Sequence, residues 1–438
     1  MSLSTVGLLV LDLVVIVAAA RVLGALARRL GQPAVIGEIA GGLLLGPVFL
    51  HGAGSAPVLF TAETRPTLKL IADIGVCVFM FLVGLGLERG LLTGQSRLAA
   101  TVSFGSTVLP FGLGVLLAFY LWESHPGENR TAFVLFLGTA MSVTAFPVLA
   151  RILTDMNLIR TPIGGIALAI AAMDDVMAWS LLALVTAVAG SGAGDFWTVA
   201  LAVPYVLVML GVVRPVLAKL AARRAGRPGG RVTWAAVLAA VAGGLWLSAM
   251  ATDRIGLHLI FGAFLFGAVL PREGAAGLRR AVLPLTERAC SVVLLPVFFV
   301  IAGFKVDLSS MDLTALGELG LILLVAVGGK FGGGFASARA IGMQPRHAVV
   351  LGTLINTRGL TELIVLSVGL QVGVLDQRLY SYMVVMALVT TAMAGVVLRF
   401  VYPADRVRLD IEALERTAAP DVVESALPHR SALPEKQS

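Results

Sequence analysis

The sequence predicts an all-α protein that crosses a membrane about thirteen times. Of its 438 residues, 58% are hydrophobic and only 13% are charged, and the mean hydropathy is +0.93. A soluble domain could not cover so much apolar surface with polar groups. The apolar residues also gather into runs long enough for membrane helices. These observations exclude a soluble domain, and the net charge of +7 is attributed to cytoplasmic loops rather than to nucleic-acid binding.

Apolar runs locate the expected spans. The first, Leu8 to Leu26, has no basic region ahead of it and is too long for a signal-peptide core, so we interpret it as a membrane helix. The second and ninth spans are short for a straight crossing. The expected spans cover residues 5–26, 33–50, 67–87, 97–121, 131–152, 162–189, 196–218, 232–251, 255–270, 282–303, 317–338, 346–371 and 379–401.

Arginine and lysine gather on one side of these spans. Each odd-numbered span is followed by a pair or cluster of basic residues, the largest between residues 214 and 231, whereas the opposite side holds scattered single charges. Because cytoplasmic loops carry the excess of positive charge, the N-terminus is expected outside and the C-terminus inside the plasma membrane. Residues 1–402 are predicted to form one transmembrane domain. Residues 403–438, with four prolines among mixed charges, are predicted to be a disordered cytoplasmic tail.

Two adjacent carboxylates lie in the middle of a predicted membrane helix. The run Ala167–Leu184 reads ALAIAAMDDVMAWSLLAL, with Asp174 and Asp175 at its centre. One carboxylate at the centre of a bilayer costs roughly 3 kcal/mol on insertion scales, and two like charges side by side resist joint ionisation. Such a pair is expected to face a water-filled cavity, a cation, a proton or a fixed positive group.

A lysine in another apolar run offers that positive group. Lys330 lies within Leu319–Ala338. Adjacent positions on a helix point about 100° apart, so one aspartate is expected to meet Lys330 while the other faces the cavity. Two acids and a lysine at membrane depth indicate the movement of cations and protons. The glycines around the lysine suit close helix contact: Gly328, Gly329, Gly332, Gly333 and Gly334.

Two spans carry residues that interrupt a helix. In span 131–152, Pro147 removes a backbone donor, with the hydroxyls of Thr139, Ser142 and Thr144 close by. Span 346–371 holds a polar stretch in mid-run: Asn356, Thr357, Arg358, Gly359, Thr361 and Glu362. Carbonyls freed by such breaks can hold a cation. Two alternatives stay open: Pro147 as a plain kink, and Arg358 with Glu362 as a structural pair four residues apart.

The two interrupted spans lie seven spans apart and run in opposite directions across the membrane. Broken helices at matching places in two halves are typical of an inverted repeat. The repeats are expected to be spans one to six and eight to thirteen, with the seventh as a linker.

Four stretches resemble a known family. They are LGQPAVIGEIAGGLLLGP (Leu30–Pro47), IADIGVCVFMFLVGLGLE (Ile71–Glu88), the segment Ser142–Trp179, and INTRGLTELIVLSVGL (Ile355–Leu370). With these, the chain resembles the monovalent cation/proton antiporters, in the branch of bacterial sodium/proton and potassium/proton exchangers, and is similar to plant and fungal cation/proton exchangers. The likeness extends to about Pro403.

The resemblance implies a fold and a set of site residues. The fold would be a core bundle with two crossing broken helices, formed by about 97–189 and 317–401, moving against a scaffold of the remaining spans that also forms a homodimer. Asp175 would bind the cation and the proton, and Asp174 would pair with Lys330. The crossover of the broken helices would hold Thr139, Ser142, Thr144, Asn356, Thr357, Arg358 and Glu362.

The function expected from these residues is exchange of a monovalent cation, Na⁺ or K⁺, for protons, which compete for Asp174 and Asp175. No cofactor is expected, and the partners are these ions and membrane lipid. The alternatives are a K⁺ efflux channel of the same fold and an exporter of another ion. An enzyme is not expected, because no His, Cys or Ser constellation converges. The choice between Na⁺ and K⁺ and the stoichiometry stay open.

Overall fold

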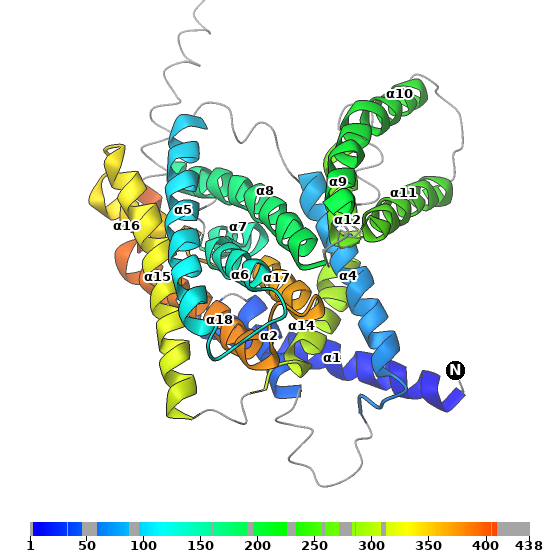
Figure 1. Ribbon diagram of the computed structural model, residues 1–438. Coiled ribbons are helices and arrows are strands. Elements are labelled where there is room, and N and C mark those ends of the chain that lie inside the picture. Colours follow the sequence, from blue (N-terminus) through cyan, green and yellow to red (C-terminus); the bar gives the residue numbers. More distant parts are fainter. Residues whose placement is uncertain are drawn as a thin grey trace, which may run out of the picture.

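The structure is a computed structural model and is helical throughout the part that it describes (Figure 1). It describes residues 3–32, 34–45, 59–86, 96–156, 158, 161–190, 196–225, 234–255, 259–270, 283–284, 286–307, 312–403 and 405–409. The helices are α1 (Leu3–Arg29), α2 (Ala34–Leu45), α4 (Arg65–Gly86), α5 (Ser96–Leu121), α6 (Arg130–Ser142), α7 (Phe146–Asp155), α8 (Pro162–Gly190), α9 (Phe196–Val208), α10 (Arg214–Ala225), α11 (Trp234–Arg254), α12 (Leu259–Val269), α14 (Leu295–Phe304), α15 (Leu313–Ala340), α16 (Pro345–Ile355), α17 (Leu360–Gln371) and α18 (Gln377–Val401). Two π-helical stretches, Met209–Val213 and Cys290–Leu294, precede α10 and α14.

Each expected span contains helix, but the number thirteen is not confirmed. Among the described residues, seven helices are long and apolar enough to cross a membrane, or eight when α16 and α17 count as one bent span. Three further apolar helices are shorter, with apolar stretches at Ile36–Leu45, Arg130–Ser142 and Leu259–Val269. Several predicted span ends, such as residues 46–50 and 87–95, lie outside the described residues.

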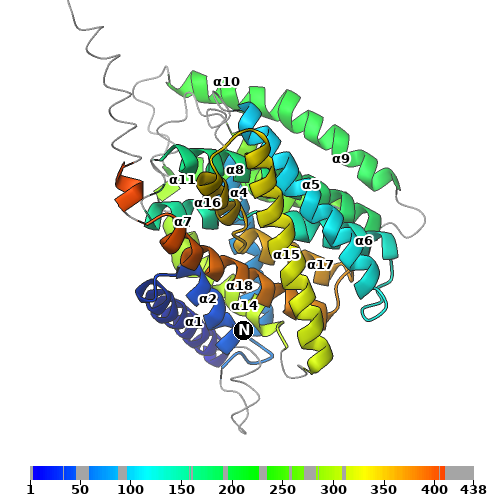
Figure 2. The ribbon, with the colours of Figure 1, turned by 90° about the vertical axis from the view of Figure 1, so that its left-hand side faces the viewer.

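The packing of the helices follows the expected two halves. In the first half α5 packs on α6, and in the second α15 packs on α16. The two halves also meet in matching pairs, because α2 packs on α14 while α4 packs on α12. The equivalent helices α5 and α15 lie side by side along one flank (Figures 1 and 2). Exchange of the halves thus reproduces these contacts, as expected for an inverted repeat.

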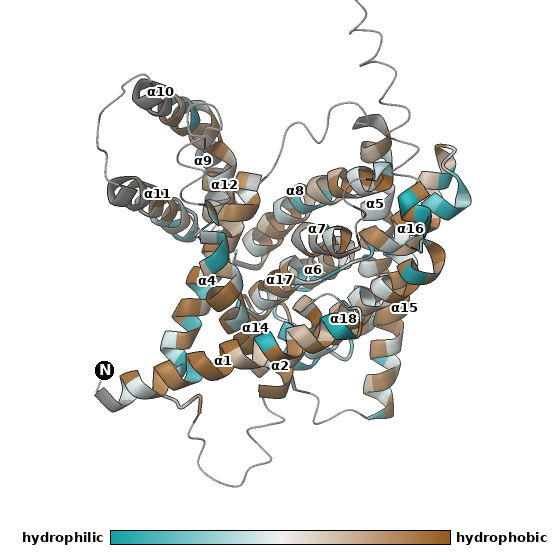
Figure 3. Ribbon diagram, turned by 180° about the vertical axis from the view of Figure 1, so that it is seen from behind, coloured by the Kyte–Doolittle hydropathy of each residue, from teal (hydrophilic) through white to brown (hydrophobic). Residues whose placement is uncertain are grey.

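Apolar residues are frequent on the outer helices, and the ribbon of Figure 3, coloured by hydropathy, shows them along α1 and α15. Val10 and Val14 on α1 and Val203 and Leu207 on α9 are each more than half exposed. Lone apolar residues are common on any surface, but rows of them on long helices are typical of a lipid-facing exterior. The polar residues of the site described below lie inside.

Close approach of α5 and α15 depends on some of the glycines predicted for it. A Cβ on Gly329 would lie 2.9 Å from Pro110, and one on Gly333 would lie 2.6 Å from the carbonyl oxygen of Gly105. Gly334 makes a similar contact with α16. The prediction is wrong for Gly328 and Gly332, where a Cβ would meet nothing within 4 Å, because these two lie on the other side of α15.

The predicted tail is described only at its start. Residues 405–409 are helical, although they belong to the stretch 403–438 that was predicted to be disordered. Residues 410–438 lie outside the described residues, and for them disorder stays a prediction.

Candidate functional site

Both predicted breaks are present. Helix α6 ends at Ser142, Val143 and Ala145 are extended, and α7 begins at Phe146. Pro147 lies in the first turn of α7, where its missing N–H is not needed. It therefore starts a second helix, and the interpretation as a plain kink is wrong. In the other half, α16 ends at Ile355 and α17 begins at Leu360, with their axes bent by 43°.

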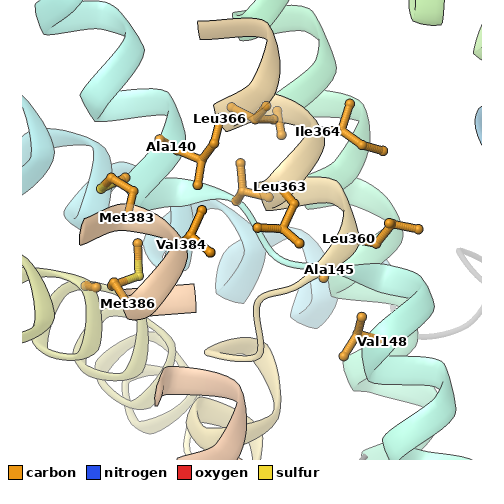
Figure 4. Close-up of a cluster of buried hydrophobic side chains, with 14 of the residues drawn as sticks. Ala140, Ala145, Val148, Leu360, Leu363, Ile364, Leu366, Met383, Val384 and Met386 are labelled. Carbon is orange, nitrogen blue, oxygen red and sulfur yellow. The ribbon is translucent and has the colours of Figure 1, made fainter. Parts of the chain in front are cut away.

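The two breaks cross each other. The backbone N–H of Ala145 donates to the carbonyl oxygen of Thr357 at 3.2 Å, and the hydroxyl of Thr144 lies 3.1 Å from the carbonyl oxygen of Ile355. Helix α17 packs against both α6 and α7. Figure 4 shows the apolar side chains around this crossing, with Ala145 beside Leu360. Each break thus provides hydrogen-bond partners for backbone groups of the other, which is how irregular backbone is tolerated at membrane depth.

The side chain of Arg358, in the second break, contacts the C-terminal end of α6. Its guanidinium donates to the carbonyl oxygens of Ala140 at 2.7 Å and Met141 at 2.6 Å, and to Glu362 Oε2 at 3.1 Å. The last carbonyls of a helix lack partners within the helix and carry partial negative charge. The structural interpretation of Arg358 and Glu362 is therefore correct, and the pair also joins the two breaks. These carbonyls are occupied by arginine, so they are not free to hold a transported cation in this conformation.

Asp174 is held by four donors from three segments. Its Oδ2 accepts from Lys330 Nζ at 2.8 Å and from the Thr144 hydroxyl at 2.7 Å, and its Oδ1 accepts from Ser103 at 2.6 Å and Thr107 at 3.3 Å. The predicted pairing of Asp174 with Lys330 is confirmed. Ser103 and Thr107 on α5 were not predicted. Their spacing of four residues, which places two hydroxyls on one face of an apolar helix, was the available signal.

Lys330 connects the acid pair to the first break. Besides Asp174, its Nζ donates to the carbonyl oxygen of Ser142 at 2.5 Å, at the end of α6. Lys330 is 0% exposed, and Asp174 is 1% exposed. A buried ammonium group in this position has both a carboxylate and a carbonyl as acceptors, so its charge is compensated.

Asp175 lies in different surroundings. It is 2% exposed, and neither carboxylate oxygen has a hydrogen-bond partner. The divergence of the two side chains was predicted and is confirmed, but Asp175 is buried and does not face the water-filled cavity that was expected. Both amide atoms of Asn356 are also buried without a partner. Asn356 follows α16, which packs against α8, the helix that carries both aspartates.

Not all predicted hydroxyls reach the acid pair. Thr139 donates to Leu135, Ser142 to Thr139 and Thr357 to Leu354, each to a carbonyl oxygen of its own segment. Such local bonds are the usual state of these side chains in helices. Of the hydroxyls predicted for the crossover, Thr144 alone bonds to Asp174 within the described structure.

A second group of titratable side chains joins three segments at one end of the bundle. His125, after α5, bonds through Nδ1 to Asp376 Oδ2 at 2.5 Å and through Nε2 to Glu318 Oε2 on α15 at 3.2 Å. Burial lowers the pKa of His125, but its bonds to the two carboxylates and their charges outweigh burial and raise it above its ordinary value. Burial raises the pKa of Asp376, but hydrogen bonds from His125 and the α18 backbone outweigh this and lower it.

The comparison with family models assigns the chain as a whole. The model described as the transmembrane sodium/hydrogen exchanger matches residues 14–402. The chain belongs to the sodium/hydrogen exchanger family. This confirms the resemblance expected from the four sequence stretches, and the all-helical fold with crossing breaks is the arrangement expected for an exchanger.

Curated relatives of this exchanger come from bacteria, plants and yeast. It is 38% identical to the Na⁺/H⁺ antiporter NhaS4 of Synechocystis over 92% of this chain and 99% of that protein. It is 38% identical to cation/H⁺ antiporter 20 of Arabidopsis thaliana over 91% of this chain, and 30% identical to K⁺/H⁺ antiporter 1 of Saccharomyces cerevisiae over 85%. The exchanger spans 49% and 44% of those two longer proteins.

A solved structure shares the fold. The sodium proton antiporter MjNhaP1 of Methanocaldococcus jannaschii superposes with a TM-score of 0.64, covering 93% of this exchanger and 99% of that chain. The sequence identity is 14%, so the likeness concerns the fold alone.

Proposed function

We propose that this exchanger is a secondary active transporter that moves a monovalent cation, Na⁺ or K⁺, against protons by alternating access. Its relatives include antiporters named for Na⁺/H⁺ and for K⁺/H⁺ exchange, which supports the class of reaction. The role of each residue in that reaction is argued from the geometry of the crossover.

The proposal depends on one observation: the described part of the crossover contains one more buried carboxylate than buried positive side chains. Among the described residues, five ionisable side chains are buried together at the crossover. Lys330 pairs with Asp174 and Arg358 pairs with Glu362, so their charges cancel. Asp175 has no such partner. An uncompensated charge at membrane depth is too costly to persist, so Asp175 requires either a proton or a cation.

Competition between the two ions at Asp175 accounts for exchange. With a proton or a monovalent cation bound, the crossover is neutral and the core can move past the scaffold. With Asp175 bare, movement would carry an uncompensated charge through a low-dielectric barrier. Return of an empty core is thereby disfavoured, and each crossing is coupled to one ion or the other.

Hard monovalent cations bind oxygen ligands. The carboxylate of Asp175 supplies two oxygens without partners, and Asn356 supplies an amide oxygen without one. We assign Asp175 as the ion- and proton-binding residue, and Asn356 as a candidate second ligand. Asp174, Lys330, Ser103, Thr107 and Thr144 form the fixed frame around it.

The proposal includes the placement in the cell. The concentration of basic residues at the ends of odd-numbered spans supports a plasma-membrane protein with its N-terminus outside and its C-terminus in the cytoplasm. A core of about 97–189 and 317–401 would move against a scaffold formed by the remaining spans. The scaffold would also hold the interface of a homodimer.

Transport by purified protein in proteoliposomes tests the function. A proton gradient is imposed, Na⁺ or K⁺ is added, and internal pH is followed with and without a clamped voltage. Exchange appears as cation-dependent proton movement, and its voltage dependence gives the net charge carried. Cation flux without proton movement would identify a channel and contradict the proposal.

The variant Asp175→Asn tests the assignment of the site. Neither oxygen of Asp175 forms a hydrogen bond of good geometry, so removal of its charge loses only the weaker attraction of the Phe146 N–H and of Lys330 and removes an uncompensated buried charge. The thermal stability is therefore expected to be unchanged or higher. Exchange is expected to be lost. Asp253→Asn, which neutralises an exposed carboxylate on α11, is the matched control and should transport like the unmodified protein. A folded Asp175→Asn protein with full exchange would refute the assignment.

A further inference from the structure

A cavity with two arginines lies apart from the crossover. It has a volume of about 400 Å³ and is bounded by residues of α1 and the turn after it, of α7, and of α18. Arg28 from the last turn of α1 and Arg399 from the last turn of α18 both line it. In Figure 2, α1, α2, α7 and α18 gather in the same region, and α2 packs on α18.

The positive charge in this cavity is not compensated by the part of the protein that is described. The other residues described as lining it are Gly31, Gln32, Ile152, Met156 and Gly395, none of which is a carboxylate. Neither Arg28 nor Arg399 forms an ion pair within the described ranges. Basic residues at helix ends interact favourably with the helix dipole, but this does not explain why two helices direct theirs into one cavity, where like charges repel.

The guanidinium of Arg399 lies against the backbone of Gly31, just after α1. Gly31 has φ of 69°, and the N–H groups of Gly31 and Gln32 donate to the carbonyl oxygens of Arg28 and Ala27, which closes the end of α1. A Cβ on Gly31 would coincide with the guanidinium of Arg399. Glycine thus provides both the left-handed conformation and the space in which Arg399 lies.

The side chain of Gln32 adds a neutral polar group. Its Oε1 is buried without a hydrogen-bond partner among the described residues. Ile152 and Met156 give the cavity an apolar wall on the side of α7. Two guanidinium forks beside an apolar wall suit a phosphate group attached to an organic residue, because arginine binds phosphate through two parallel hydrogen bonds.

We propose that this cavity is a binding site for a phosphate-bearing anion that bridges Arg28 and Arg399. The site lies on the face that the proposed topology assigns to the cytoplasm, so the anion is either the headgroup of an anionic phospholipid of the inner leaflet or a soluble phosphate compound. Arg28 belongs to the proposed scaffold and Arg399 to the proposed core. A bound phosphate therefore ties the two together and slows exchange, a consequence that rests on the proposed function.

Binding is tested without reference to transport. Thermal unfolding of the detergent-solubilised protein is followed while dioctanoyl phosphatidylglycerol, dioctanoyl phosphatidylcholine or inorganic pyrophosphate is added. Ligands that bind the folded state raise the unfolding temperature by mass action. A rise with phosphatidylglycerol alone identifies a lipid headgroup site, and a rise with pyrophosphate identifies a soluble ligand. If neither exceeds phosphatidylcholine, the proposal is overturned.

Variants of the two arginines test the location. Arg28→Gln and Arg399→Gln should each weaken the apparent affinity roughly tenfold or more, because each removes charge-assisted hydrogen bonds. Arg399→Lys, which keeps the charge and loses the planar fork, should have an intermediate effect. Arg29→Gln removes the same charge from the same end of α1 but does not line the cavity, and should bind like the unmodified protein. If Arg29→Gln lost as much affinity as the other variants, the anion would be responding to general surface charge, and the proposed site would be refuted.

The consequence for exchange is measured in proteoliposomes of phosphatidylcholine with and without phosphatidylglycerol, or with pyrophosphate inside. The bound anion should lower the initial rate in the unmodified protein and not in Arg399→Gln. If the protein binds the anion but no exchange occurs in any lipid, the proposed function fails and the binding site stands. If exchange occurs and is indifferent to an anion that binds, the bridging role is wrong.

Discussion

The buried pair of Lys330 and Asp174 allows a quantitative test of how charge is held at the crossover. Lys330→Met removes the ammonium group and leaves a side chain of similar length. It breaks the 2.8 Å contact with Asp174 and the bond to the carbonyl oxygen of Ser142. Removal of one partner of a buried ion pair destabilises a protein by about 3–5 kcal/mol, because the other charge is left uncompensated. Asp174→Asn should destabilise the protein by a similar amount, since it leaves Lys330 without an opposite charge.

The double variant Lys330→Met, Asp174→Asn separates the pair from its surroundings. An asparagine amide oxygen can still accept hydrogen bonds from Ser103 and Thr107, so the remaining cost is that of altered hydrogen bonds, about 1–2 kcal/mol. The two single losses would sum to about 6–10 kcal/mol. The double variant is thus expected to be more stable than either single variant, with a coupling energy of several kcal/mol.

Reversible unfolding in mixed lipid–detergent micelles measures these free energies, with all four proteins under one set of conditions. The matched control is Asp253→Asn combined with Lys330→Met, in which the two changes share no contact and their effects should add. Additive effects of Lys330→Met and Asp174→Asn would refute the reasoning, because they would mean that the two charges do not compensate each other in the folded protein.

Two further results are expected from particular contacts. His125 has a raised pKa and Asp376 a lowered one, so their bond contributes fully to stability only between the ordinary pKa of an aspartate and the ordinary pKa of a histidine. This stability is lost as pH rises through the pKa of folded His125 or falls through that of folded Asp376. It is measured by unfolding the unmodified protein and His125→Gln over a range of pH. If the stability of the two proteins fell identically on the alkaline side, the expectation would be contradicted. Gly329→Ala should destabilise the protein, because the new Cβ would lie 2.9 Å from Pro110, whereas Gly328→Ala meets nothing within 4 Å and should be neutral or gain up to about 1 kcal/mol from helix propensity. Equal unfolding temperatures for these two variants would show that α5 and α15 adjust without cost.

The charged part of the site could be predicted from the sequence because membrane burial restricts what a charge can do. The acid pair and Lys330 lie in separate apolar runs and need opposite charges, so the cost of burial predicted that one aspartate would pair with Lys330. The choice of Asp174 came from the family resemblance. The breaks near Pro147 and Gly359 followed from backbone chemistry, since proline lacks a donor and a polar stretch in mid-span cannot face lipid. These inferences did not require knowledge of how the helices are arranged.

Contacts that depend on the arrangement of helices were not predictable in the same way. Arg358 was expected to pair with Glu362, four residues along, but its bonds to Ala140 and Met141 exist only because the second break crosses the first. The group of His125, Glu318 and Asp376 unites residues up to 251 positions apart, at the ends of three segments. The number of spans was uncertain for a related reason: short apolar helices become spans or not through their neighbours, and length alone does not decide this.

The contrast between the two aspartates explains why a site of this kind needs both. Asp174 is fixed by Lys330, Ser103, Thr107 and Thr144, which come from α15, α5 and the α6–α7 break. These bonds hold the ends of the broken helices in register, so Asp174 cannot give up its partners without loosening the crossover. One position further along α8, the side chain turns by about 100° and leaves that network. Asp175 is therefore held in place by the backbone of a helix that its neighbour anchors, while its own oxygens accept no hydrogen bond of good geometry and have the backbone N–H of Phe146, at the start of α7, in their vicinity. The proposed role of Asp175 follows from this contrast: a carboxylate that is rigidly placed but unpaired could accept either a proton or a metal ion, and exchange of the two would require that property.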